Sequence, residues 1–108
     1  MSRREQPASD DAGSRAVRVS LAREIASVVV ARGLSQREAA ELLGTTQPKI
    51  SALMGGKVEG FSMDRLVTYL NLLGEDIHIV VLPKPSERER ARTWVINPAS
   101  NAGVPAHA

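Results

Sequence analysis

The chain lacks cysteine, has only three aromatic residues among its 108 and contains no long apolar run. The absence of cysteine excludes disulfides and Cys-ligated zinc. No apolar run approaches the roughly 18 residues that a membrane span requires. The N-terminal stretch MSRREQPASDDAGSR also lacks the apolar core of a secretory signal. These features predict a cytoplasmic protein without a membrane partner.

Residues that could form a catalytic or metal site are scarce. The two histidines, His78 and His107, are far apart in the sequence, and no second His or Cys accompanies either one. His78 lies between Ile77 and Ile79, where a solvent-facing strand position is expected. No serine lies in a nucleophile elbow, and no glycine-rich loop has a phosphate-binding pattern. We therefore expect no enzyme activity, no catalytic residue, no metal and no cofactor.

Composition favours one small, mainly α domain, because a chain with 43% hydrophobic residues and few aromatics must build its core from Leu, Ile, Val and Ala. Residues 1–18 mix Arg, Asp, Ser, Gly and Pro without periodicity, which predicts a flexible N-terminal arm. The net charge of +2 does not by itself decide the partner.

The folded part is expected to begin near Ser20 and to contain four to five short helices within residues 19–75. Leu21, Ile25, Val28 and Val29 recur at a helical period before Gly33. This pattern predicts a first helix over 20–32.

Two short helices follow with only two residues between them. Ser35 and Glu38 form an S-x-x-E capping box, which predicts a helix from 36 to 43. Thr46 is a good N-cap for a third helix over 47–54, and this start places Pro48 at the second helical position. Its missing N–H costs no ladder hydrogen bond there, so Pro48 belongs to the first turn of the helix.

A fourth helix is predicted from its N-cap, Ser62, to its stop at Gly74. The period then changes, because residues 76–82 are rich in β-branched side chains and Pro83 bounds them. This predicts a strand, and a second candidate strand covers 92–96. The alternation of Arg and Glu in the connecting SERERAR predicts a solvated, partly self-paired connection rather than a DNA-binding arm. Residues 98–108 are expected to be disordered.

Residues 34–53 match the helix-turn-helix plan, in which the second helix enters the major groove of DNA. Ala39 is small enough for a close helix crossing, Gly44 makes the turn, and Ile50 and Leu53 face the core. Positions 45–58 contain no Asp or Glu, although acids occur on both sides. Such a polar, acid-free surface is what contact with phosphates requires.

The segments LSQREAAELLGTTQPKISALMGGK and FSMDRLVTYLNLLG resemble the Xre family of phage Cro- and repressor-like helix-turn-helix proteins. The resemblance covers residues 21–74. It implies a phage-repressor-like domain that binds paired half-sites of double-stranded operator DNA as a homodimer, and therefore a transcriptional regulator.

The resemblance also implies which residues contact DNA. Gln36 corresponds to a phosphate-binding glutamine, and Gln47 to a recognition-helix glutamine that reads adenine. Pro48 and Ala52 stand where related proteins often carry polar readers, so direct base reading falls to Gln47, Lys49 and Ser51. Arg37 is open to two interpretations, an ion pair with Glu41 or a DNA contact. The predicted set is Gln36, Arg37, Thr45, Thr46, Gln47, Pro48, Lys49, Ser51 and Lys57.

The C-terminal region 76–97 resembles that of small antitoxin-type regulators of this family, including HigA-like proteins, in which a strand helps to form the dimer. Residues 77–82 are then expected to pair either with the same segment of a second copy or with a hairpin of the same chain. The favoured function is a dimeric, sequence-specific repressor that reads the major groove with helix 47–54. The alternative is an antitoxin that neutralises a toxin by protein binding and regulates its own operon. A bare helical scaffold without DNA affinity is the third hypothesis.

Overall fold

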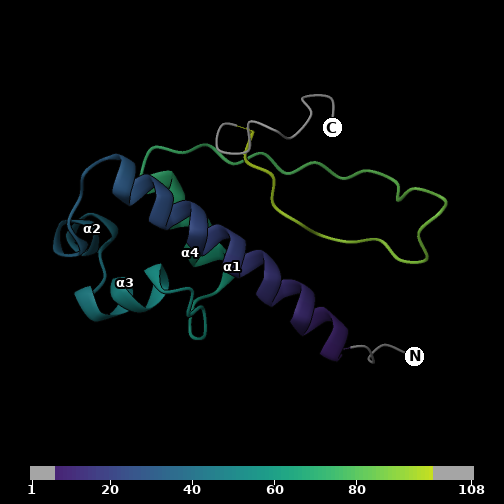
Figure 1. Ribbon diagram of the computed structural model, residues 1–108, viewed down its shortest axis with the longest axis horizontal. Helices are drawn as coiled ribbons and strands as arrows, with labels where there is room; N and C mark the ends of the chain where they lie inside the picture. The colour runs from purple at the N-terminus through teal and green to yellow at the C-terminus, as the bar shows by residue number, and fades with distance from the viewer. Residues whose placement is uncertain (1–6, 99–108) are drawn as a thin grey trace.

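The computed structural model describes residues 7–98, and the side chains from Ser14 onward. Four helices follow one another: α1 (Pro7–Ala31), α2 (Gln36–Leu43), α3 (Gln47–Met54) and α4 (Met63–Leu72). Figure 1 shows α1 as a long helix across the domain, with α2 and α3 near its C-terminal half and α4 behind it. None of the helices in this part of the chain is both long enough and apolar enough to cross a membrane.

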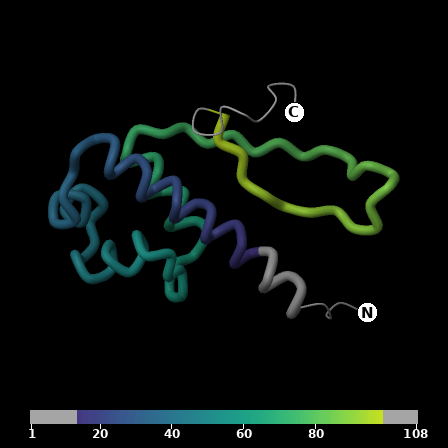
Figure 2. The backbone as a smooth tube through the Cα atoms, viewed as in Figure 1, coloured from purple at the N-terminus to yellow at the C-terminus, as the bar shows by residue number. Residues whose placement is uncertain are grey.

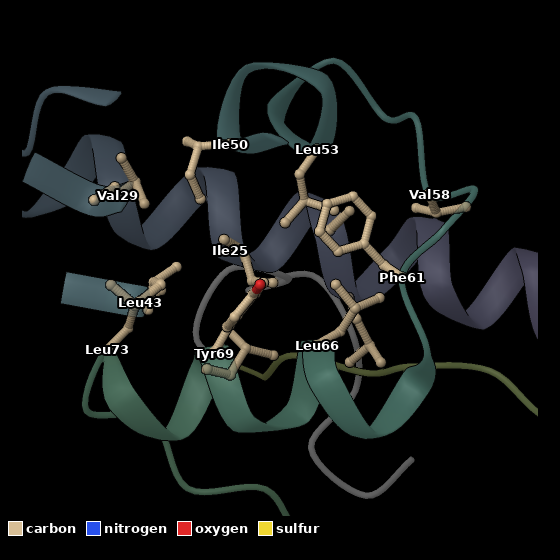
Figure 3. Close-up of a cluster of buried hydrophobic side chains, with 14 of the residues drawn as sticks. Ile25, Val29, Leu43, Ile50, Leu53, Val58, Phe61, Leu66, Tyr69 and Leu73 are labelled. Carbon is tan, nitrogen blue, oxygen red and sulfur yellow. The ribbon is translucent and has the colours of Figure 1, made fainter. Parts of the chain in front are cut away.

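The core lies where the four helices meet. α1 packs against α4 and α3, while α2 packs against α3 and α4. Figure 3 shows the central side chains converging from all four helices and from the loop between α3 and α4. Phe61 of that loop meets Tyr69 of α4 edge to face, with ring centroids 6.3 Å apart. The largest fully buried side chains are those of Ile25, Ile50, Leu53, Leu66, Leu73, Val29 and Val58. The predicted mainly α domain is confirmed, while its mostly aliphatic core also contains two aromatic residues, Phe61 and Tyr69.

The start of α1 corrects one prediction. Residues 7–18 are helical rather than a flexible arm, and Val17 is only 5% exposed within the core. Arg18 donates a hydrogen bond from Nη1 to the carbonyl oxygen of Val58, 3.0 Å away. Pro7 suits the first position of a helix, where its missing N–H would have no partner. Tertiary contacts therefore extend this helix beyond the periodic apolar stripe, and residues 1–6 of the predicted arm lie outside the described residues.

The predicted strands over 76–82 and 92–96 are a second correction, because no strand forms within residues 75–98. This segment runs away from the helices and returns as an open loop (Figures 1 and 2). The N–H of Glu75 still donates to the oxygen of Leu70 at 2.9 Å. Within residues 76–98, the one main-chain hydrogen bond is that of a turn, from the N–H of Arg88 to the oxygen of Pro85, 3.1 Å. The two arms of the loop do not form a ladder, so their β-branched residues lack the cross-strand pairing that stabilises a sheet.

The two ends of this open loop are in contact with the helical domain. Ile77 and Val95 are partly buried against the core, and Asn97 donates a hydrogen bond from Nδ2 to Oε1 of Glu24. Between them, Ile79, Val80, Val81 and Leu82 are each at least 73% exposed. The tail predicted over 98–108 lies almost wholly outside the described residues.

Two arginines of the connecting segment lie over the ring of Trp94, which differs from the predicted self-paired arrangement. The guanidinium of Arg92 lies 4.9 Å from the ring centroid of Trp94, and that of Arg88 lies 5.7 Å from it. Both distances are within the range of cation–π attraction. The outer arm is therefore organised around Trp94, whose ring is itself about half exposed.

Candidate nucleic-acid interface

The start of α2 is fixed by the predicted capping box. The N–H of Glu38 donates to Oγ of Ser35 at 3.0 Å, and the N–H of Ser35 donates to Oε1 of Glu38 at 2.8 Å. These two bonds satisfy amides that a helix start otherwise leaves without partners. The hydrogen bonds from Ser35, first from its main chain and then from its side chain, hold the pKa of Glu38 below its ordinary value of 4.5.

The turn between α2 and α3 depends on Gly44. Its φ of 70° lies in the left-handed region, which costs a residue with a Cβ free energy. The N–H of Thr45 donates to the oxygen of Ala40 at 2.9 Å and closes the end of α2. Ala39, with no measurable exposure, belongs to the core, and α2 packs against α3. The tight turn and the small residue together let α3 pack closely against α2.

The first turn of α3 accommodates a proline, because its N-cap is Thr46. Oγ1 of Thr46 accepts from the N–H of Lys49 at 3.4 Å, and the carbonyl oxygen of Thr46 accepts from the N–H of Ile50 at 3.0 Å. Pro48 lies in the first turn, before the ladder begins, so its ring removes no hydrogen bond. The predicted role of Pro48 as a first-turn residue is confirmed.

α3 has one buried and one exposed face. Ile50 and Leu53 are at most 1% exposed and hold the helix to the core. The exposed side chains include those of Gln47, Pro48, Lys49 and Ser51. The helix therefore presents polar groups, with no acid among them, to the surroundings.

The other predicted residues flank this face. Gln36 is the first residue of α2 and is half-buried, while Arg37 beside it is exposed. No ion pair joins Arg37 to Glu41 within residues 14–98, so that alternative is not what the structure shows. Lys57 is exposed in the loop after α3. The guanidinium of Arg37 and the ammonium of Lys57 are therefore accessible to a ligand.

Glu59 directly follows the acid-free stretch in the sequence, and an arginine of α1 forms an ion pair with it. Its Oε2 lies 3.1 Å from Nε of Arg15. A hydrogen bond from its own main-chain N–H, and then the bond from Arg15, lower the pKa of Glu59 from its ordinary value of 4.5. The ionised carboxylate is thus matched by a cation, which reduces its repulsion of any anion near Lys57.

Three of the predicted residues line one shallow hollow. Thr45, Thr46 and Lys49 meet Arg65 and Thr68 of α4 there, with Leu43, Gly44 and Tyr69 as the remaining lining residues. Arg65 and Thr68 do not belong to the predicted set, because they follow α3 in the sequence by more than ten positions and no local motif connects them to it. The clue in the sequence is that Arg65 is the only basic residue between positions 58 and 83.

Nothing in this geometry resembles a metal centre. Across residues 14–98, no three His, Cys, Asp or Glu side chains gather closely enough to hold an ion. The chemistry available on the exposed face of α3 is hydrogen bonding and positive charge.

The comparisons with known proteins agree with this geometry. A family model described as a helix-turn-helix domain matches residues 5–82. A solved structure assigned to the XRE family of transcriptional regulators is 45% identical, with 81% of this chain and 98% of that chain covered and a TM-score of 0.75. No curated protein has a significant match to the chain. The chain therefore belongs to the Xre-type helix-turn-helix family of transcriptional regulators.

Proposed function

We propose that this protein is a sequence-specific transcriptional repressor that binds an operator in double-stranded DNA as a homodimer. The observation that carries the proposal is the exposed, acid-free first turn of α3, which Thr46 caps and which Ile50 and Leu53 fix to the core. A helix held in this way enters the major groove with its N-terminal residues against the base edges. A repressor of this kind acts in the cytoplasm, where the chromosome lies.

Base reading falls to few side chains. The amide of Gln47 matches N6 and N7 of adenine, which it contacts bidentately. Lys49 and Ser51, both exposed, supply further donors on the same helix. The ring of Pro48 has no N–H to donate and offers an apolar contact to a thymine methyl group. Discrimination between sequences therefore depends most on Gln47, while Lys49 also fits a contact at the edge of the groove or to a phosphate.

Phosphate contacts orient the domain on the duplex without reading its sequence. Gln36 and Arg37 stand at the start of α2, and Thr45 and Thr46 precede α3. Lys57 follows α3 and is exposed. These positions begin α2, precede α3 and follow α3, so we expect them to meet phosphates on the two sides of a groove that receives α3.

Dimerisation is proposed through residues 76–82. The side chains at 79, 80, 81 and 82 are all exposed. In a strand, those at 79 and 81 would lie on one face and those at 80 and 82 on the other. A second copy of the same segment, arranged by two-fold symmetry, supplies both a main-chain ladder and apolar cover. A dimer doubles the DNA contacts of a module that alone buries too little surface to be selective.

The DNA proposal is tested by selecting bound sequences from a random duplex library and measuring affinity for the selected site. A Gln47→Ala, Lys49→Ala double variant is expected to lose at least tenfold in affinity, since each good base contact contributes about 1–3 kcal/mol. The matched control is Ser27→Ala, Lys84→Ala, which removes exposed polar groups from α1 and the C-terminal loop. Full affinity in a folded Gln47, Lys49 variant would show that α3 is not the recognition helix.

The dimer proposal is tested by sedimentation with two variants, Ile79→Lys, Val81→Lys and Val80→Lys, Leu82→Lys. Lysines on an exposed edge oppose strand pairing, so a mixture of dimer and monomer is expected to shift to monomer in at least one variant. Affinity for a two-half-site operator should fall with it. A wild-type chain that stays monomeric at tens of micromolar, or two variants that dimerise normally, would contradict the proposal.

The second candidate function is the antitoxin, and the same exposed apolar segment favours it. A segment of this kind is also suited to adding a strand to a partner protein. Co-purification with the product of the neighbouring reading frame separates the two: capture that is lost in the lysine variants supports the antitoxin, and absence of capture removes it while leaving DNA binding intact.

A further inference from the structure

We propose that Arg65 of α4 binds a phosphate of the DNA backbone together with Lys49 of α3, and so positions the recognition helix in the groove. This assignment rests on the proposed DNA-binding function. The two residues belong to different helices, and the hollow that they line has a volume of about 450 Å³.

Positive charge and hydroxyl groups dominate this hollow. Besides Lys49 and Arg65, its lining residues include Thr45, Thr46 and Thr68, and none of the eight lining residues is acidic. Neither cationic side chain has an ion-pair partner among residues 14–98. Two cations beside each other without a carboxylate repel one another, and an anion between them relieves that repulsion.

The shape of the hollow favours the backbone of a polymer over a small molecule. Small-ligand sites are enclosed and mostly apolar. This hollow is open to solvent, and Arg65, Thr68, Thr46 and Lys49 are all exposed. A guanidinium presents a planar fork that binds two oxygens of one phosphate, and threonine hydroxyls add donors to the remaining oxygens.

The position of the hollow ties it to α3. Thr46 is the N-cap of α3 and Lys49 lies one turn further on, so the hollow adjoins the side chains that are proposed to read bases. α4 is fixed to the same core by Leu66 and Tyr69, which follow Arg65 by one and four positions in the helix. A phosphate held by Arg65 would therefore set the depth and tilt of α3 without contributing to sequence choice.

The experiment measures the affinity of the full chain for its selected operator and for an unrelated duplex over a series of salt concentrations. Arg65→Ala is expected to weaken binding to both duplexes by roughly tenfold. The slope of log affinity against log salt should fall by about one, as for loss of one phosphate contact. Arg65→Lys should restore the slope and part of the affinity, because it keeps the charge without the fork. Arg23→Ala, at an exposed arginine of α1, is the matched control.

If Lys49 and Arg65 bind the same phosphate, a double variant provides a further test. The effects of Lys49→Ala and Arg65→Ala on affinity should be less than additive in the double variant, since groups in one network couple. Thermal unfolding followed by circular dichroism establishes that each variant is folded.

Three results would overturn the assignment. Unchanged affinity and salt slope in Arg65→Ala, with binding lost in the Gln47 variant, would overturn the role of Arg65 alone. A loss confined to the operator would make Arg65 a base reader or a dimer contact. Absence of wild-type binding to every duplex would overturn both this assignment and the proposed function.

Discussion

Arg32 and Leu73 join the ends of two helices. Nη1 of Arg32, just beyond α1, donates a 2.9 Å hydrogen bond to the carbonyl oxygen of Leu73, which caps α4. A cation beside the last carbonyls also favours the negative end of the helix dipole. Since the segment 75–98 leaves the domain directly after this point, the bond fixes where the outer loop begins.

Replacing Arg32 with Ala is expected to lower the free energy of unfolding by about 1 kcal/mol, because the Leu73 carbonyl loses its charged donor. Urea unfolding followed by circular dichroism measures the change. The control is Arg23→Ala, which removes an exposed arginine from α1. Equal stability of the two variants would mean that the Arg32 bond contributes nothing net.

Glu38 should make stability depend on pH. Because its folded-state pKa lies below the ordinary 4.5, the ionised group stabilises the fold above the unfolded-state pKa, and this contribution disappears as pH falls through the lower, folded-state pKa. Glu38→Gln keeps an acceptor for the N–H of Ser35 but does not titrate. We expect its urea midpoint to fall less steeply than that of the wild type as pH drops below 4.5.

A second variant separates the two shifted acids. The pKa of Glu59 is lowered by a hydrogen bond from its own main-chain N–H and then by the hydrogen bond from Arg15. Glu59→Gln should remove its own share of the acid sensitivity and leave that of Glu38. Parallel pH profiles for the wild type and both variants would contradict the assigned causes.

Ala39 tests the closeness of the α2–α3 packing. Ala39→Leu adds volume to a site with no measurable exposure, and overpacking of this kind costs about 1–3 kcal/mol. DNA affinity should fall as well, because α3 is displaced from α2. Ala31→Leu, at the exposed end of α1, makes the same chemical change without a packing cost. The prediction fails if both variants unfold at the same urea concentration.

Gly44 tests the turn. An added Cβ would meet nothing within 4 Å, so any cost of Gly44→Ala arises from its φ of about +70° alone. We expect about 1 kcal/mol of destabilisation. Gly44→Asn should cost less, because Asn tolerates the left-handed region better. Gly55→Ala, at φ −86°, is the matched control and should change stability little.

The helix starts could be predicted from sequence because their signals are local. Ser35, Thr46 and Ser62 each cap the helix that was expected to follow, and the turn at Gly44 needs only nearby residues. The long first helix could not be predicted, since residues 7–18 lack a continuous apolar stripe. Contacts such as Arg15–Glu59 and Arg18–Val58 join positions 40 or more residues apart.

In the C-terminal segment, the sequence predicted strands that the structure does not form. Its β-branched residues carry a strand signal, but a strand forms only when a partner satisfies its main chain, and the described chain supplies none. Arg65 was missed for a related reason, because only the packing of α4 brings it beside Lys49. The helices that carry the predicted contact residues begin and end as the sequence predicts. The roles of these residues on DNA stay predictions.

Extended, exposed main chain over 79–82 also has a consequence for the lifetime of the protein. Proteases bind their substrates as extended, unpaired backbone, and exposed loops are where they cleave first. We therefore expect proteases to cleave this uncovered apolar segment, and the proposed assembly would hide the same bonds. Turnover in the cell would then follow the supply of a binding partner, and the amount of regulator would be set by assembly as well as by synthesis.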